Sequence, residues 1–138
     1  NNMAAELKTK ERVLHVTRPG LKTDEVIDFY KTWAKEYDQD LDGGGASYTG
    51  PRKVAEVVAA ALGERRDVRV LDVAAGTGFL GVELSKLGFS NVDALDASQE
   101  MLDVAKTKNV YKNFLKEFLG PNRLNIDDGK VFVLFDML

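Results

Sequence analysis

The stretch Val70-Leu71-Asp72-Val73-Ala74-Ala75-Gly76-Thr77-Gly78-Phe79-Leu80-Gly81 joins an almost wholly apolar run to a glycine turn. A short apolar run of this kind is typical of a strand covered by helices on both faces. Glycines let the backbone bend sharply and approach a ligand closely, and the apolar residues beyond them follow helical spacing. The stretch therefore predicts a buried strand, a tight turn and a helix.

The flanking sequence continues this alternation of strands and helices. Asp67 to Val73 is the first predicted strand, and a helix follows from about Phe79 to Leu87. Further strands are predicted at residues 91–95, 111–119 and 130–137, with a helix around Met101 behind an N-cap at Ser98. Strands that alternate with helices indicate right-handed βαβ units in a parallel sheet.

Two helices are predicted before the first strand. Apolar and aromatic residues recur at steps of three and four from Asp24 to Leu41. A glycine-rich linker leads to a second helix, in which Pro51 takes the first position and Gly63 follows the end. We expect a flexible arm over residues 1–22 and one domain over residues 23–138.

Composition excludes several classes of function. The chain has 138 residues, and 19 Lys and Arg against 22 Asp and Glu give a net charge of −3, which disfavours nucleic acid as a partner. Without cysteine and with His15 as its single histidine, the chain is expected to hold neither a disulfide nor a metal. Its apolar runs are far shorter than the roughly 20 residues that span a bilayer, so we expect no membrane segment and a cytoplasmic location, with the nucleus as the alternative.

The glycine turn and a later acid point to one ligand site. Asp96 directly follows the second strand, and the carboxyl ends of neighbouring parallel strands face the same crevice. A carboxylate there can accept hydrogen bonds from both hydroxyls of a ribose. The sequence therefore predicts a nucleotide-like cofactor held by Gly76, Thr77, Gly78 and Asp96.

The glycines alone do not choose the cofactor. Gly76, Gly78 and Gly81 also satisfy the G-x-G-x-x-G pattern of dinucleotide-binding proteins. Asp72 separates the alternatives, because a carboxylate four residues before the first glycine would repel a pyrophosphate and attract the ammonium group of an amino-acid cofactor. A purely structural role for Asp72, bonding to loop N–H groups, stays open.

The residues from Val70 to Gly78, with Asp96 after them, resemble the first motif and the ribose-binding acid of class I S-adenosylmethionine-dependent methyltransferases. Together with the aromatic helix around residues 29–40, they are similar to the methyltransferase-like proteins of the Williams-Beuren deletion region type. The resemblance covers about residues 23–128. It implies a Rossmann-like α/β fold in three layers, incomplete here, with about four mostly parallel strands and N-terminal helices.

The resemblance also implies a cofactor and roles for individual residues. S-adenosyl-L-methionine would be the cofactor and S-adenosyl-L-homocysteine its product. Asp72, Ala74, Gly76 and Gly78 would line the methionine moiety, Asp96 would hold the ribose, and Ala97 and Met101 would lie near the adenine. Tyr30, Trp33 and Tyr37 would cover the cofactor as part of a lid, although an aromatic stripe at helical spacing is equally typical of a core.

The methyl acceptor is expected to be a small molecule or a protein, and no catalytic residue is assigned. Two alternatives stay open: a catalytically incomplete or inert form that acts by association, and a nicotinamide-dependent oxidoreductase, which Asp72 disfavours. Because the chain ends soon after its fourth predicted strand, we expect a truncated form of the fold. Residues Val131 to Phe135 would then form an exposed apolar edge that pairs with a second copy.

Overall fold

The computed structural model describes residues 23–42, 49–118, 129 and 131–134. It divides the chain into two compact units, Asn1–Tyr48 with Leu138 and Thr49–Met137. The predicted arm and most of the predicted linker lie outside the described residues. The predicted domain over residues 23–138 stays a prediction.

The first unit contains the helix α2, Thr23–Asp42, which confirms the helix predicted from Asp24 to Leu41. Asp24 and Glu25 lie in its first turn, where negative charge interacts favourably with the helix dipole. Trp33 is buried and packs edge-to-face against Phe29, with 5.8 Å between the ring centroids. The aromatic residues of α2 thus include one pair in which Trp33 is buried and Phe29 is half-buried.

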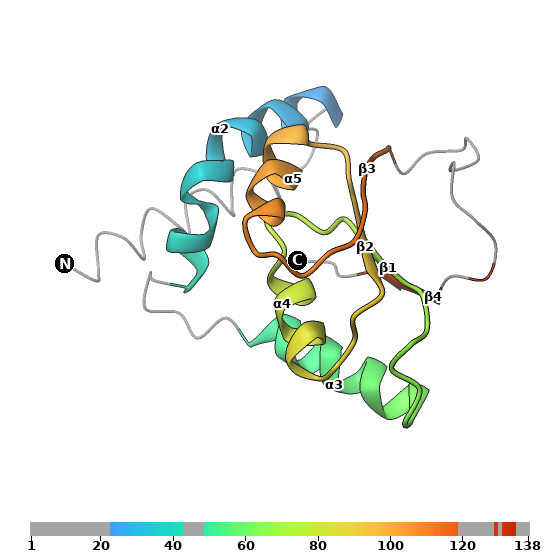
Figure 1. Cartoon of the computed structure of the whole chain (residues 1–138). Helices are drawn as coiled ribbons and strands as arrows, with labels where there is room; N and C mark the ends of the chain where they lie inside the picture. The colour runs from blue at the N-terminus through green and yellow to red at the C-terminus, as the bar shows by residue number, and fades with distance from the viewer. Residues whose placement is uncertain (1–22, 43–48, 119–128, 130, 135–138) are drawn as a thin grey trace. The chain divides into compact units, whose positions relative to one another are not determined.

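The second unit is built on a four-stranded sheet (Figure 1). Its strands are β1 (Val70–Val73), β2 (Val92–Asp96), β3 (Phe114–Lys116) and β4 (Val131–Leu134). Their order is β3-β2-β1-β4, and every neighbouring pair is parallel. This arrangement confirms the predicted Rossmann-like α/β fold with four parallel strands.

Three helices accompany the sheet: α3 (Gly50–Leu62), α4 (Phe79–Lys86) and α5 (Gln99–Lys106). Gly63 follows α3 with φ of 60°, and the Ser98 hydroxyl caps α5 by accepting from the Met101 amide at 3.2 Å. Because β1, α4, β2, α5 and β3 succeed one another in one direction across the sheet, right-handed crossovers place α4 and α5 on the same face.

Alternate residues of the strands supply two apolar clusters. Val70 and Val92 join Ala55 from α3 and Leu84 from α4 in one cluster. Leu71, whose side chain alternates with that of Val70, belongs to another cluster with Val73 and Leu95. The strands are therefore apolar on both faces, as the buried pattern predicts, and the second helical layer of the three-layer arrangement stays a prediction.

Some boundaries differ from the predicted ones. β1 begins at Val70 rather than Asp67; β4 covers residues 131–134 of the predicted 130–137, and the rest of that prediction lies outside the described residues. The predicted third strand over residues 111–119 is wrong in its extent, because β3 begins only at Phe114, although the backbone of Lys112 and Asn113 already bonds to β2. The aromatic residue before it, Tyr111, turns toward β1 instead.

Within the described ranges, no helix is long and apolar enough to cross a membrane, and no group of three His, Cys, Asp or Glu side chains could hold a metal ion. The cytoplasmic location stays a prediction.

Candidate functional site

Asp72 lies at the third position of β1, and its side chain is fully buried. Its Oδ2 atom accepts a hydrogen bond of 2.6 Å from the Tyr111 hydroxyl, whereas its buried Oδ1 atom has no hydrogen-bond partner within the described part of the chain. Burial raises the pKa of Asp72 to about 7, the bond from Tyr111 lowers it, and the nearby Asp96 carboxylate raises it. A buried carboxyl group, one of whose oxygens accepts no hydrogen bond from the described residues, thus lies beside the glycine turn.

The turn after β1 contains three residues with positive φ. Ala74, Gly76 and Gly78 have φ of 58°, 59° and 98°. Glycine adopts this region freely, but an alanine there costs roughly 1–2 kcal/mol, and such local strain is concentrated at functional sites. The turn therefore holds Ala74 in a left-handed backbone conformation that alanine by itself disfavours.

Asp96, at the end of β2, connects its own strand to the glycine turn. Its Oδ2 atom accepts from the Gly76 amide at 2.8 Å, and its Oδ1 atom accepts from the Ser98 amide at 2.9 Å. Burial raises the pKa of Asp96, while the backbone amides of Ser98, Gly76 and Ala97 lower it. The structure thus brings Asp96 and the turn together, as the strand order predicts, at the carboxyl ends of β1 and β2.

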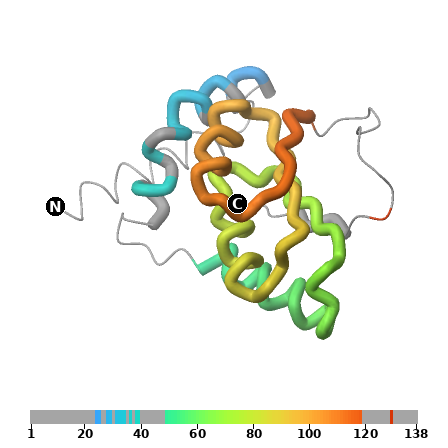
Figure 2. Tube along the Cα trace, in the orientation of Figure 1, coloured from blue at the N-terminus to red at the C-terminus, as the bar shows by residue number. Residues whose placement is uncertain are grey.

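Tyr111 is the residue of this site that the sequence analysis missed. It lies in the connection from α5 to β3, which the tube in Figure 2 follows from residue 107 to residue 113. Its hydroxyl accepts from the Gly81 amide at 3.1 Å and donates to Asp72. Burial and the neighbouring Asp72 raise the pKa of Tyr111, so the phenol stays protonated.

The ring of Tyr111 also explains two of the glycines. A Cβ atom at Gly81 would lie 2.2 Å from Cζ of Tyr111, and one at Gly78 would lie 3.1 Å from its Cε2. A glycine inside a predicted helix is a signal of close approach, and Gly81 carried that signal in the sequence. The signal does not identify the residue that approaches.

Lys108, which is half-buried, also contacts the glycine turn. Its Nζ atom donates to the carbonyl oxygen of Thr77 at 3.1 Å and lies 5.1 Å from the ring centroid of Phe79. The connection that carries Tyr111 is therefore tied to the glycine turn a second time.

The other predicted site residues have varied surroundings. Thr77 and Met101 are buried, and Ala97 is half-buried beside Asp96. Trp33 belongs to the other unit, and the side chains of Tyr30 and Tyr37 lie outside the described residues. The predicted contacts of these aromatic residues with a cofactor stay predictions.

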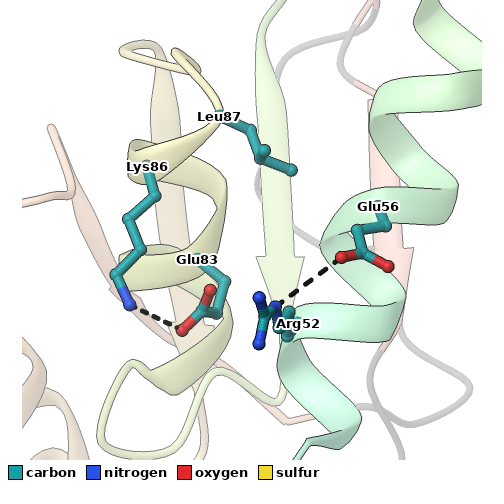
Figure 3. Close-up of a pocket in the computed structure, with 5 residues that line it drawn as sticks. All are labelled: Arg52, Glu56, Glu83, Lys86 and Leu87. Atoms are coloured by element: carbon teal, nitrogen blue, oxygen red, sulfur yellow. Dashed lines mark hydrogen bonds and ion pairs between the residues drawn. The ribbon is translucent and has the colours of Figure 1, made fainter.

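A surface pocket of about 340 Å³ lies between α3 and α4 (Figure 3). Its charged side chains form pairs along each helix, Arg52 with Glu56 at 3.7 Å and Lys86 with Glu83 at 3.0 Å. None of the predicted site residues lines this pocket. The candidate site therefore remains the group around Asp72, Asp96 and Tyr111.

Comparison with known proteins finds a family model that matches the segment holding the site. Residues 70–131, which contain the strand, the glycine turn and Asp96, match the family described as methyltransferase domain. This segment of the chain is therefore similar to methyltransferase domains. Asp72, Asp96 and Tyr111 thus lie within the matched methyltransferase segment.

Individual relatives match over more of the chain. Methyltransferase-like protein 27 of Homo sapiens is 34% identical over 104 residues, which are 75% of this chain and 42% of that protein. Ribosomal protein L11 methyltransferase of Clostridium perfringens is 31% identical over 108 residues, or 76% of this chain and 34% of that protein. The crystal structure of Streptomyces venezuelae DesVI aligns with 61% of this chain and 35% of that chain, at 27% identity and a TM-score of 0.49. The chain spans less than half the length of each of these proteins, and the narrower resemblance to the Williams-Beuren type stays a prediction.

The fit between Gly81 and Tyr111 can be tested by stability. Gly81→Ala is expected to destabilise the fold by about 1–3 kcal/mol, because its Cβ atom overlaps the Tyr111 ring. In a Tyr111→Leu background, whose side chain is shorter, the same change should stabilise by up to about 1 kcal/mol, the usual gain of alanine over glycine within a helix. Urea denaturation followed by circular dichroism measures both; an equal loss in the two backgrounds would contradict the steric explanation.

Proposed function

We propose that this chain is the cofactor-binding part of an S-adenosylmethionine-dependent methyltransferase that acts on a small-molecule or protein acceptor. The observation that carries the proposal is the buried carboxyl group of Asp72, near the carboxyl end of β1. Its Oδ1 atom has no hydrogen-bond partner among the described residues. The match of residues 70–131 to the methyltransferase domain family supports the same interpretation. The ammonium group and the ribose of this cofactor each have a candidate partner among these residues.

Asp72 suits the ammonium group of the methionine moiety. A buried carboxylate attracts a cation more strongly than one in water, either directly or through a bridging water. The positive charge would in turn favour the ionised form of Asp72, whose pKa of about 7 lies close to neutral pH. The pyrophosphate of a dinucleotide would be repelled by the same carboxylate.

Asp96 suits the ribose. Its Oδ2 and Oδ1 atoms accept from the Gly76 and Ser98 amides, and because a carboxylate has about four lone-pair sites, acceptor capacity remains for a ribose hydroxyl. Since the Gly76 amide already donates to Asp96, it is not free to bind a phosphate. Ala97 and Met101 follow Asp96 and would lie near the adenine, and Tyr30, Trp33 and Tyr37 would cover the cofactor.

When bound, S-adenosylmethionine supplies a methyl group on a sulfonium: a bond forms from the acceptor to the methyl carbon, the carbon–sulfur bond breaks, and its electron pair stays on sulfur. The chain's own residues contribute mainly alignment. Asp72 would hold the methionine end of the cofactor and Asp96 its ribose, on either side of the sulfonium, and the glycine turn would lie along the methionine moiety. No described residue is assigned as a base for the acceptor.

Calorimetric titration with S-adenosylmethionine, S-adenosylhomocysteine and NAD tests the proposed cofactor. We expect both S-adenosyl compounds to bind at one site per chain and NAD to give no heat of binding. Binding of NAD alone would overturn the proposal in favour of a dinucleotide-dependent enzyme. Binding of none of the three would overturn it as well.

The role of Asp96 can be tested by Asp96→Asn. Loss of the charge should weaken S-adenosylhomocysteine binding by about 1–3 kcal/mol, since hydrogen bonds to charged groups contribute this much. Asp93→Asn is the matched control, because Asp93 lies on the same strand, is also buried and bonds to Asn113 instead. Equal losses in both variants, measured by calorimetry, would remove Asp96 from the ribose site.

We also propose that β4 pairs with a second copy of the chain. Within the described sheet, β4 is hydrogen-bonded to β1 on one side and has no described strand on the other. An uncovered edge presents unpaired N–H and C=O groups to another strand. Light scattering should give a mass that rises toward that of a dimer with concentration, and a constant monomer mass would contradict the proposal.

A further inference from the structure

We propose that Tyr111 is a positioning residue of the cofactor site: its hydroxyl occupies one oxygen of Asp72 and leaves the other oxygen for the cofactor's ammonium group. The inference rests on the proposed function, because it assigns a partner to a residue of that same site. Tyr111 belongs neither to the glycine motif nor to the pair of acids, Asp72 and Asp96, that accompanies it.

The direction of the hydrogen bonds is settled by the donor at Gly81. The backbone amide of Gly81 can only donate, so the Tyr111 oxygen is its acceptor at 3.1 Å. The single phenolic proton is then directed to Oδ2 of Asp72, at 2.6 Å. Amide, phenol and carboxylate form a short chain in which each bond polarises the next.

The ring of Tyr111 has little freedom to leave this position. It lies against Gly81, where a Cβ atom would collide with it, and against Gly78, where a Cβ atom would be in tight contact with it. On the other side it packs edge-to-face with Phe114, with 5.7 Å between the ring centroids. The carboxylate plane of Asp72 is thereby held at one oxygen, while Oδ1 has no hydrogen-bond partner among the residues that the structure describes.

The charge state of Asp72 depends on the same contact. The ionisable groups that act on Asp72 are Tyr111, from the connection before β3, and Asp96, from the end of β2. The hydroxyl of Tyr111 lowers the pKa of Asp72, whereas burial and Asp96 raise it to about 7. Without the hydroxyl, Asp72 takes up its proton at a higher pH and attracts an ammonium group less well.

The test compares two ligands in Tyr111→Phe, which keeps the ring and removes only the hydroxyl. S-adenosylhomocysteine carries the ammonium group, and 5′-methylthioadenosine keeps the adenosine and sulfur without the amino acid. Calorimetry at pH values from 5.5 to 8 should show wild-type affinity for S-adenosylhomocysteine falling as the pH drops through about 7. In Tyr111→Phe the fall should begin at higher pH, giving about three- to tenfold weaker binding near pH 7, because one pKa unit corresponds to a tenfold change.

Binding of 5′-methylthioadenosine should change by less than about twofold in Tyr111→Phe at every pH, since its contacts do not include Asp72. In an Asp72→Asn background, Tyr111→Phe should have no further effect on S-adenosylhomocysteine. Lys108→Met is the matched control: it removes a bond from the same connection to the same turn, and it should not shift the pH profile.

A measurement without ligand separates this inference from the proposed function. In the free chain, the carboxyl carbon signal of Asp72 in NMR should titrate at higher pH in Tyr111→Phe than in the wild type. If neither S-adenosyl compound binds the wild type, the proposed function fails and the inference falls with it. If they bind, but Tyr111→Phe weakens both nucleosides equally or leaves the titration of Asp72 unmoved, the inference alone is overturned.

Discussion

The hydrogen bond between Tyr111 and Asp72 is the contact on which the rest of the site depends. A carboxyl group buried in a strand loses the hydration of its charged form, and it is retained only where protein groups replace part of that hydration. Tyr111 supplies this bond from a segment 39 residues away along the chain. Because its ring must reach Asp72 between the turn and α4, positions 78 and 81 have little or no room for a side chain.

Asp96 applies a similar constraint at the neighbouring strand. By accepting from Gly76 and Ser98, it fixes the end of β2 against the end of β1 before any ligand arrives. The positive φ values of Ala74, Gly76 and Gly78 are held by this bonding and by the sheet below. A turn that is ordered in advance loses less entropy when it binds, which favours a site for a cofactor whose two ends must be aligned.

The sequence is sufficient to predict the strands, the helices and the convergence of Asp72, Asp96 and the turn, because these follow from local periodicity and from the direction of parallel strands. The Ser98 cap and the end of α3 at Gly63 follow from equally local rules. Tyr111 could not be assigned in this way. Its aromatic side chain fits the alternation of a strand, and only tertiary packing directs it to Asp72 rather than into the ladder with β2.

The three glycines of the G-x-G-x-x-G pattern have separate physical origins in this chain. Gly76 adopts a left-handed conformation and donates its amide to Asp96, Gly78 combines a positive φ with a close aromatic contact, and Gly81 leaves space for the Tyr111 ring. In dinucleotide-binding proteins the same spacing serves a tight turn, the approach of a pyrophosphate and helix packing. The same spacing of glycines thus arises from different structural constraints, so the pattern does not determine the cofactor. The discriminating feature is the charge beside the turn: a buried carboxyl group with an unpartnered oxygen favours a cationic group and opposes a polyanion.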